Sequence, residues 1–226
     1  MDNYSVYANE ELESWTERSG LLEQEAYLIE KYIQDDSRLI EAGTGGGRIS
    51  LEIDKVFKDV NIVAFDFVAD MIRSAKMKSD KIDFRVLDAS DLSVFEDESF
   101  DFAIYLQQIV SLVPGSLVSK VLEEAYRILK KDGVIIFSFL YYEGRRINPL
   151  LSFLVNGVRF LRGEERNRQC LPWLKLGGRA NLKLFSKDQA TTYWFEENEA
   201  REVLEKIGFQ ILEVKKDNML YVVCRK

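Results

Sequence analysis

The feature that most constrains the fold of this chain is a glycine-rich turn that directly follows an apolar stretch. Residues 39–49 read Leu-Ile-Glu-Ala-Gly-Thr-Gly-Gly-Gly-Arg-Ile, so a candidate strand leads into Gly43-x-Gly45-x-Gly47 and a candidate helix follows. Glycine permits a tight turn and lets a ligand approach the backbone closely. The first N–H groups of the following helix have no partner inside that helix. The loop is therefore either a ligand-binding turn or a purely structural one.

The middle of the chain alternates short apolar runs with amphipathic segments. The expected strands are Ser37–Glu41, Asn61–Phe65, Ile82–Val86, Phe100–Leu106 and Val134–Phe139, and the expected helices are Arg48–Phe57, Ala69–Lys78 and Ser116–Leu129. In the last helix Val118, Leu122 and Leu129 recur at helical spacing. The basic residues and glycine of Lys130–Gly133 are typical of a helix stop. Strands separated by helices at this interval predict right-handed crossovers and a parallel sheet.

The C-terminal part follows a different pattern. A helix is expected at Glu196–Ile207, where Gly208 ends it. Two apolar runs follow, Phe209–Val214 and Leu220–Cys224, and the polar segment Lys215–Met219 joins them. A short polar turn between two strands predicts an antiparallel hairpin.

Two of the expected strands end in carboxylates. Asp66 follows one strand, 23 positions after Gly43, and Asp88 follows the next strand. Open α/β sheets bind ligands at the carboxyl ends of their strands, where an acidic residue can accept hydrogen bonds from ribose hydroxyls. The alternatives are a cap for the helix that begins near Ala69 and an ordinary turn aspartate.

The chain contains no histidine, which excludes several kinds of chemistry. Ser-His-Asp and Cys-His units are impossible, and the two cysteines, Cys170 and Cys224, cannot form a zinc cage. We therefore expect no metal site. So few cysteines favour a reducing, cytoplasmic location, and no signal peptide or membrane-spanning run is expected. The net charge of −7 argues against nucleic-acid binding.

From about Arg38 onward these motifs resemble the class I, Rossmann-like, S-adenosylmethionine-dependent methyltransferases. The acidic-plus-glycine signature matches at residues 41–47, residues 99–104 resemble the fourth strand with its lead-in, and residues 123–133 resemble the helix and glycine before the fifth strand. The terminal hairpin is similar to the antiparallel seventh strand of this family. The resemblance implies an α/β three-layer sandwich whose seven-stranded, mostly parallel sheet has the order 3-2-1-4-5-7-6.

The resemblance also implies the cofactor, S-adenosylmethionine, which leaves as S-adenosylhomocysteine. The implied cofactor-binding residues are Glu41, Gly43, Gly45, Gly47, Asp66, Phe67, Met71, Asp88, Ala89 and Gln107. The three glycines would pass beside the methionine part and the sugar. Glu41 would lie near the loop and the cofactor's amino group.

The remaining implied roles concern the nucleoside and the methyl group. Asp66 would hold both ribose hydroxyls, and Asp88 would meet the adenine amino group. Phe67 and Met71 would flank the adenine, unless they are simple core residues. Gln107 would face the position where the methyl group is offered. The sequence around it has no Asn-Pro-Pro-Tyr-like motif, which argues against methylation of an adenine or glutamine amino group.

No catalytic residue can be assigned from the sequence. Methyl transfer from a sulfonium depends mainly on positioning, so the absence of histidine is compatible with it. Tyr141, Tyr142 and Glu143 follow the fifth strand and are candidate bases. Tyr4 and Tyr7 could fold over the cofactor from the N-terminus.

Two segments flank the core of what we expect to be a single domain, residues 1–226. Residues 1–36 are predicted to form a helical cap, with helices near Asn9–Thr16 and Leu21–Gln34. An insertion at 143–192 is predicted to form a lid over the substrate side, and a helix is expected to start at Asn148-Pro149. Its residues 143–187 contain ten basic and three acidic side chains. The insertion could recognise an apolar small molecule, and its arginines could pair with an anionic group on that molecule. Its apolar helix with basic flanks could instead lie on a membrane surface, or its basic residues could pair with the acidic N-terminal segment.

The predicted function is therefore methyl transfer to a small molecule. A nicotinamide-dependent oxidoreductase would require Gly-x-Gly-x-x-Gly, but position 48 is Arg48. A cofactor-binding regulatory or scaffold protein without catalysis is the remaining alternative.

Overall fold

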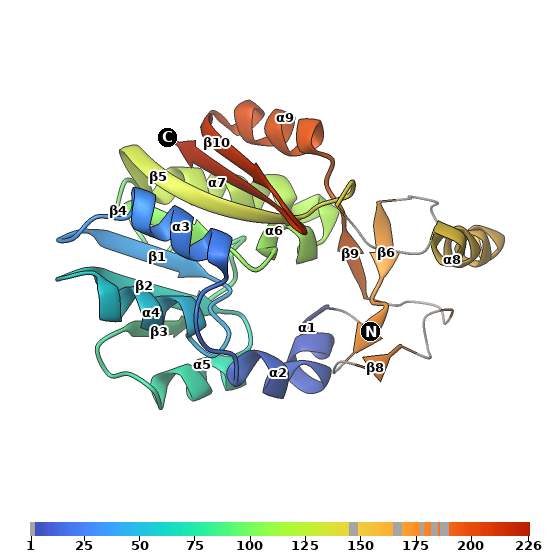
Figure 1. Ribbon diagram of the computed structural model, residues 1–226, viewed down its shortest axis with the longest axis horizontal. Helices are drawn as coiled ribbons and strands as arrows, with labels where there is room; N and C mark the ends of the chain where they lie inside the picture. The colour runs from blue at the N-terminus through green and yellow to red at the C-terminus, as the bar shows by residue number, and fades with distance from the viewer. Residues whose placement is uncertain (1–2, 145–148, 165–168, 177–178, 182–184, 186–189) are drawn as a thin grey trace.

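The structure is a computed structural model that describes residues 3–144, 149–164, 169–176, 179–181, 185 and 190–226. Its centre is a seven-stranded sheet in the order β10-β11-β5-β4-β1-β2-β3 (Figure 1). The strands are β1 (Arg38–Ala42), β2 (Asn61–Asp66), β3 (Asp83–Val86), β4 (Phe100–Tyr105), β5 (Leu129–Leu140), β10 (Gln210–Lys216) and β11 (Met219–Arg225). Numbered along the chain and counted from the other edge, the order is 3-2-1-4-5-7-6, which confirms the prediction.

The first five strands of the sheet pair in parallel, and the last two form the antiparallel end. β1 pairs with β2 and β4, β2 with β3, and β4 with β5, all in parallel. β11 pairs antiparallel with both β5 and β10. The carboxyl ends of the parallel strands therefore lie along one edge of the sheet, which is where such sheets bind ligands.

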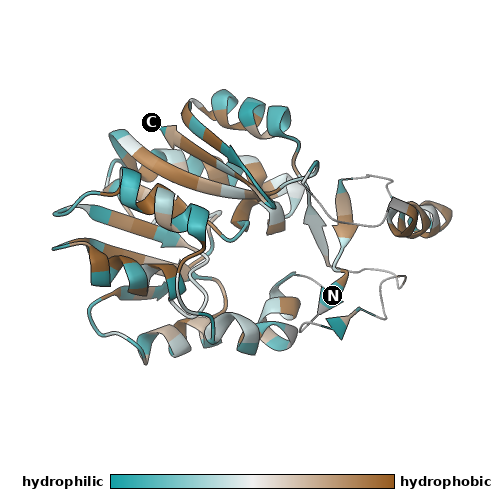
Figure 2. Ribbon diagram, viewed as in Figure 1, coloured by the Kyte–Doolittle hydropathy of each residue, from teal (hydrophilic) through white to brown (hydrophobic). Residues whose placement is uncertain are grey.

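Helices cover both faces of the sheet because successive strand residues point to opposite sides. Leu39 packs into a core with α3 (Glu23–Tyr32), α4 (Arg48–Val56) and α5 (Ala69–Lys76), and Ile40 packs into a second core with α7 (Val118–Ile128) and α9 (Glu197–Ile207). These two cores make the three-layer sandwich that the sequence predicts. In Figure 2 the strands are largely hydrophobic, while the helices carry both hydrophobic and hydrophilic residues.

Two further groups of elements lie to one side of the sheet (Figure 1). The N-terminal group is α1 (Asn3–Ser5), the π-helix η1 (Val6–Glu10) and α2 (Leu12–Thr16). The other group is α8 (Pro149–Leu161), β6 (Cys170–Pro172), β7 (Lys175–Leu176), β8 (Arg179–Ala180) and β9 (Thr191–Tyr193). β6 pairs with β9 and β7 with β8, both antiparallel. The short α6 (Ile109–Leu112) and the 3-10 helix η2 (Gly115–Leu117) follow β4.

Several predicted boundaries differ from the structure. The segment Lys130–Gly133, expected to be a helix stop, lies inside β5. The reason is that α7 ends at Ile128 and the chain becomes extended from Leu129 onward. A shift in the pairing of β4 with β5 and a left-handed Asp132 (φ 63°) accommodate the change. The final hairpin has a shorter turn than expected, Asp217 and Asn218, because the lysines before it continue the exposed edge strand.

The helices of the two flanking segments also differ from the prediction. The first expected N-terminal helix is divided, with a π-helix at Val6–Glu10 and an α-helix at Leu12–Thr16. The second is shorter at both ends, Glu23–Tyr32. In the insertion, α8 begins at Pro149 as expected, while Asn148 lies outside the described residues. The strands β6 to β9 are two or three residues long, too short for a period-2 pattern to reveal them. In the described part of the chain no helix has the length and hydropathy needed to cross a membrane.

Candidate functional site

The glycine-rich loop joins β1 to α4 at the centre of the sheet's carboxyl edge. Gly43 has a φ of 65°, in the left-handed region, and a Cβ placed there would lie 1.9 Å from the Cδ1 atom of Ile109. Gly47 has a φ of 84° and is the N-cap of α4, where a Cβ would lie 3.1 Å from the ring of Phe84. Both positions require glycine, the first for close approach by α6 and the second for the turn into the helix.

Glu41 holds this loop in place through hydrogen bonds. Its side chain is completely buried, and one oxygen, Oε2, accepts hydrogen bonds from Thr44 Oγ1 (2.9 Å) and from both the backbone N–H (3.1 Å) and the hydroxyl of Ser50. The other oxygen, Oε1, has no hydrogen-bond partner among the described residues. Burial raises the pKa of Glu41 to about 7, although the bonds from Ser50 and Thr44 and the charge of Arg48 act in the opposite direction.

This pKa predicts a pH dependence of stability. The folded protein binds the Glu41 proton more tightly than the unfolded chain, whose carboxyl keeps its ordinary pKa of 4.5. The free energy of unfolding should therefore fall as pH rises from 4.5 to about 7, and the loss should be complete above that range. The side chain of the Glu41→Gln variant carries no charge. The free energy of unfolding of the variant, relative to that of the wild type, should therefore rise with pH across the same range. Urea unfolding below, within and above the range measures this, with the Glu52→Gln variant of the partly exposed Glu52 as control. A difference between Glu41→Gln and wild type that does not change with pH would contradict the assignment.

Asp66 connects the loop to the end of β2. Its Oδ2 accepts a hydrogen bond from the backbone N–H of Gly45 (2.9 Å), and its Oδ1 accepts one from that of Val68 (2.9 Å). Burial raises the pKa of this carboxyl, and the two backbone N–H groups lower it. One strand further on, Asp88 accepts from the backbone N–H and the hydroxyl of Ser90, both at 2.8 Å. Asp88 is therefore held by the loop that follows its strand, and Asp66 by both the loop after β2 and the glycine loop after β1.

A cavity of about 290 Å³ opens between the loop and these two strand ends, and we call it the glycine-loop cavity. Eight of the ten predicted cofactor residues line it: Gly43, Gly45, Asp66, Phe67, Met71, Asp88, Ala89 and Gln107. The other two, Glu41 and Gly47, are not among its lining residues and support the loop from behind. The structure thus brings together residues from four separate strand ends.

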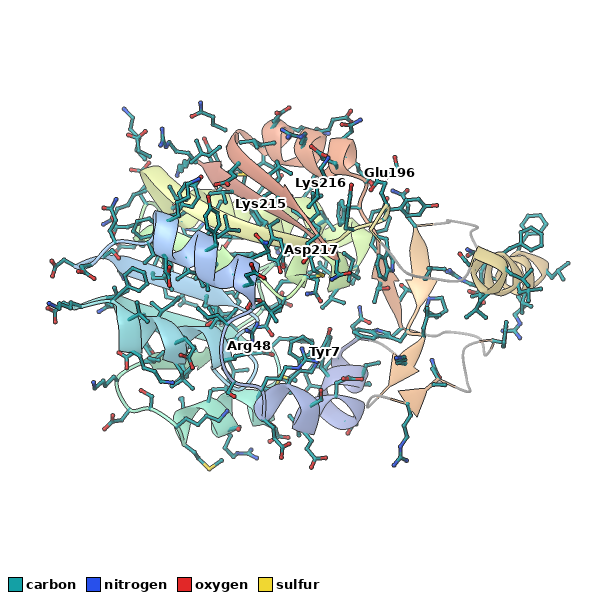
Figure 3. The ribbon with its side chains drawn as sticks, in the orientation of Figure 1. Tyr7, Arg48, Glu196, Lys215, Lys216 and Asp217 are labelled. Atoms are coloured by element: carbon teal, nitrogen blue, oxygen red, sulfur yellow. The ribbon has the colours of Figure 1, made fainter. Side chains whose placement is uncertain are left out.

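The N-terminal segment covers this cavity. Tyr4 and Tyr7 both line it, and the ring of Phe67 lies 5.4 Å from that of Tyr4 and 6.3 Å from that of Tyr7. Figure 3 shows Tyr7 between the N-terminal helices and the sheet. Burial and the carboxylates of Glu11 and Asp66 raise the pKa of Tyr7 well above its ordinary value, so its hydroxyl keeps its proton near neutral pH. Tyr7 is therefore part of the cavity wall and a poor base.

The lining of the glycine-loop cavity combines an acceptor with apolar surface. The carboxylate of Asp66 can accept hydrogen bonds, and Phe67, Met71 and Ala89 form apolar parts of the wall. Two buried donors on the same walls, Tyr7 Oη and Trp15 Nε1, have no partner among the described residues. Buried polar groups are normally hydrogen-bonded, so these atoms are consistent with a polar ligand in the cavity.

A second cavity, of about 460 Å³, lies beside the first, and we call it the tryptophan cavity. It is lined by all three tryptophans of the chain, Trp15, Trp173 and Trp194. Its charged lining residues are Glu11, Arg18 and Lys175. The Arg18 guanidinium stacks on Trp15, 3.8 Å from the ring centroid. Trp15 and Leu112 line both cavities, so the two are neighbours with a common wall.

The residues after β4 lie at this junction. Gln107 lines the glycine-loop cavity and Gln108 lines the tryptophan cavity. Both have left-handed backbone conformations, with φ values of 61° and 62°. Such conformations are uncommon for residues other than glycine and concentrate at functional sites. The backbone N–H of Gln108 donates to Ser138 Oγ (3.1 Å), which anchors the turn to β5.

Sequence reasoning did not identify the tryptophan cavity. One signal for it was present, because Glu11, Ser14, Trp15 and Arg18 all line it at the spacing of one helical face. The residues of the insertion gave no such signal. Tyr141, Tyr142 and Glu143, considered above as bases, line neither cavity.

Part of the chain is similar to known proteins. A family model described as a methyltransferase domain matches residues 40–137. A ubiquinone/menaquinone biosynthesis C-methyltransferase of Rickettsia bellii is 33% identical over 111 residues. That match covers 45% of this chain and 43% of the relative, so the chain matches less than half the length of this curated protein.

Solved structures extend the similarity to the whole fold. An S-adenosylmethionine-dependent methyltransferase of Methanosarcina mazei superposes with a TM-score of 0.68 at 24% identity, over 88% of this chain and 96% of the other. The 1,6-didemethyltoxoflavin-N1-methyltransferase of Burkholderia thailandensis, with bound 1,6-didemethyltoxoflavin and S-adenosylhomocysteine, gives 0.66 at 14% identity, over 99% of this chain and 85% of the other.

Proposed function

We propose that this chain, whose residues 40–137 match the model of a methyltransferase domain, is a class I S-adenosylmethionine-dependent methyltransferase that transfers a methyl group from this cofactor to a flat, largely apolar small molecule. The observation that carries the proposal is the pair of adjoining cavities, one with the chemistry of an adenosyl site and one walled by tryptophans, which share Trp15 and Leu112.

In this proposal the eight predicted residues that line the glycine-loop cavity contact the cofactor, and Glu41 and Gly47 support the loop. When bound, S-adenosylmethionine supplies an electrophilic methyl group on a sulfonium. The protein's task is then to hold the acceptor in line with that group, and positioning of this kind can lower a barrier by roughly 7–11 kcal/mol. Gln107 and Gln108, which face the two cavities from one turn, are the residues we assign to this alignment.

The acceptor's character follows from the tryptophan cavity. Trp173 and Trp194 offer broad apolar surfaces that suit a flat ring. Arg18 and Lys175 can attract an anionic substituent. Glu11 is the carboxylate on this wall, and we assign it the role of accepting a proton if the acceptor must lose one. The similarity to the toxoflavin and quinone methyltransferases supports a small-molecule acceptor.

Residues 1–36 and 143–192 act as a cap and a lid in this proposal. Asn3 joins them, because its side-chain N–H group donates to Leu112 O (2.6 Å) and to Thr191 O (3.1 Å). Its side-chain oxygen accepts from Trp173 Nε1 (3.1 Å). Asn3 thus connects the N-terminal segment to the end of α6 and to the insertion. The free thiols of Cys170 and Cys224 support a reducing, cytoplasmic setting for the reaction.

Trp194→Ala tests the acceptor site separately from the cofactor site, because Trp194 lines the tryptophan cavity and does not line the glycine-loop cavity. Methyl transfer would be measured with a panel of flat aromatic acids and neutral ring compounds. We expect turnover of at least one acceptor, with a KM raised about tenfold in the variant through loss of ring contact. The affinity for S-adenosylmethionine should be unchanged. Tyr27→Ala, an exposed aromatic on α3, is the control. Tight cofactor binding without turnover of any acceptor would instead support a binding-only role.

A further inference from the structure

Helix α8 presents an apolar face to solvent. Leu150, Phe153, Leu154, Phe160 and Leu161 are between 49% and 85% exposed. At 3.6 residues per turn these five positions fall within an arc of about 120°. Gly157 is the only other residue on that arc. The exposed side of this helix therefore carries no polar side chain.

The opposite face of α8 is buried and mostly polar. Ser152, Val155 and Asn156 are each less than 9% exposed. Arg159 is also on this side, where its Nη1 donates to the carbonyl of Cys170 (2.7 Å) and its Nε pairs with Glu164 (3.0 Å). An ordinary surface helix has the reverse arrangement, with its apolar stripe against the core. Figure 2 shows α8 as a largely hydrophobic helix that projects from the molecule.

The segment around α8 has the opposite charge from the rest of the protein. Residues 143–187 contain ten Lys and Arg and three Asp and Glu, a net charge of +7 within a chain of net charge −7. Arg162, Lys175 and Arg179 are exposed members of this set. An apolar helix face beside basic residues is typical of helices that lie in the surface of membranes containing anionic lipids.

We propose that α8 lies in the surface of an anionic lipid membrane, with its apolar face among the acyl chains and the exposed Arg162, Lys175 and Arg179 against the headgroups. A helix of 13 residues is about 20 Å long, too short to span a bilayer but suited to lying in its surface. A second copy of the chain is the less favoured occupant, because two insertions of charge +7 would repel each other if their α8 faces met.

Docking through α8 would bring the tryptophan cavity to the membrane. Arg159 ties α8 to Cys170, the first residue of β6, and the next two residues of that strand, Leu171 and Pro172, line the cavity. An acceptor dissolved in the membrane would then lie close to the site. Membrane docking of α8 does not require methyl transfer, so vesicle binding can be measured without the reaction.

Vesicle flotation of the full-length protein tests this proposal. We expect the protein to float with vesicles of phosphatidylcholine and phosphatidylglycerol, to float less with phosphatidylcholine alone, and to be released by added salt. The double variant Phe153→Ser/Phe160→Ser should reduce partitioning at least about tenfold through loss of two inserted rings. The double variant Val56→Ser/Met77→Ser removes apolar side chains that are at least about as exposed, one at the end of α4 and one directly after α5, and should partition like the wild type.

Circular dichroism spectra of all variants should match that of the wild type, which shows that they fold. Leu161→Ser, at the most exposed of the five positions, is a second test and should weaken partitioning in the same direction. A wild type that ignores anionic vesicles, or a folded Phe153→Ser/Phe160→Ser variant that partitions normally, overturns the proposal. A dimer in ultracentrifugation that this variant abolishes, without vesicle binding, would instead assign the face to a second copy.

Discussion

Replacing Asp66 by alanine is expected to weaken the binding of S-adenosylmethionine at least about tenfold, because charged hydrogen bonds contribute about 1.5–3 kcal/mol each. The substitution removes the acceptor that we assign to the ribose. It also removes the two hydrogen bonds that Asp66 accepts from Gly45 and Val68, so the glycine loop loses its connection to β2. Calorimetric titration with S-adenosylmethionine and with S-adenosylhomocysteine measures the loss.

The control for this prediction lies four residues further along the chain. Asp70→Ala removes an exposed carboxylate in the first turn of α5. Among the described residues this carboxylate forms an ion pair with Arg73 and does not line the cavity, so cofactor affinity should not change. Asp66→Asn keeps one accepting oxygen and should fall between alanine and wild type. An unchanged dissociation constant in a folded Asp66→Ala protein would refute the placement of the ribose.

Replacing Glu25 by alanine is expected to lower the free energy of unfolding by about 3–5 kcal/mol, the cost of leaving a buried charge without its partner. Both oxygens of Glu25 accept from the Arg48 guanidinium, at 2.7 and 2.8 Å, and the two side chains are only 3% and 7% exposed. Figure 3 shows Arg48 near the start of the helix that follows the glycine loop. The pair joins α3 of the N-terminal segment to α4.

Glu52→Ala is the control for this effect. Glu52 pairs with Lys55 on the surface of α4, and exposed pairs of this kind contribute about 0–1 kcal/mol. Urea unfolding of both variants gives the comparison. A loss below about 1 kcal/mol in Glu25→Ala would show that the Arg48 charge is relieved in some other way, for example by the carbonyl of Gly20, to which it also donates.

The parallel sheet and the glycine-loop cavity could be predicted because their signals are local. Gly43 is followed within the same loop by Gly45 and Gly47, and Asp66 and Asp88 each end a strand. In a parallel sheet all strand ends meet at one edge, so residues that are local to separate strands are brought together by the topology alone. Eight of the ten predicted cofactor residues accordingly line one cavity.

The tryptophan cavity could not be predicted in this way. Trp15 comes from the N-terminal segment, while Trp173 lies in the insertion and Trp194 directly after it, both more than 150 residues later. The insertion reaches the N-terminus through Asn3, and nothing in the spacing of either segment indicates that contact. The placement of Gln107 and Gln108 could not be predicted either. Both have left-handed backbone conformations that the sequence does not reveal, and one lines each cavity.

The sequence by itself therefore determined the sheet, its antiparallel end and the position of the glycine loop, since alternating apolar runs and glycines act through neighbouring residues. Tertiary structure alone decided which segments close over that loop and which face of α8 is buried. The amphipathic pattern of α8 defines two faces but does not say which one meets the protein. The contacts of Arg159 with Cys170 and Glu164 place its polar side inward and leave the apolar side in solvent.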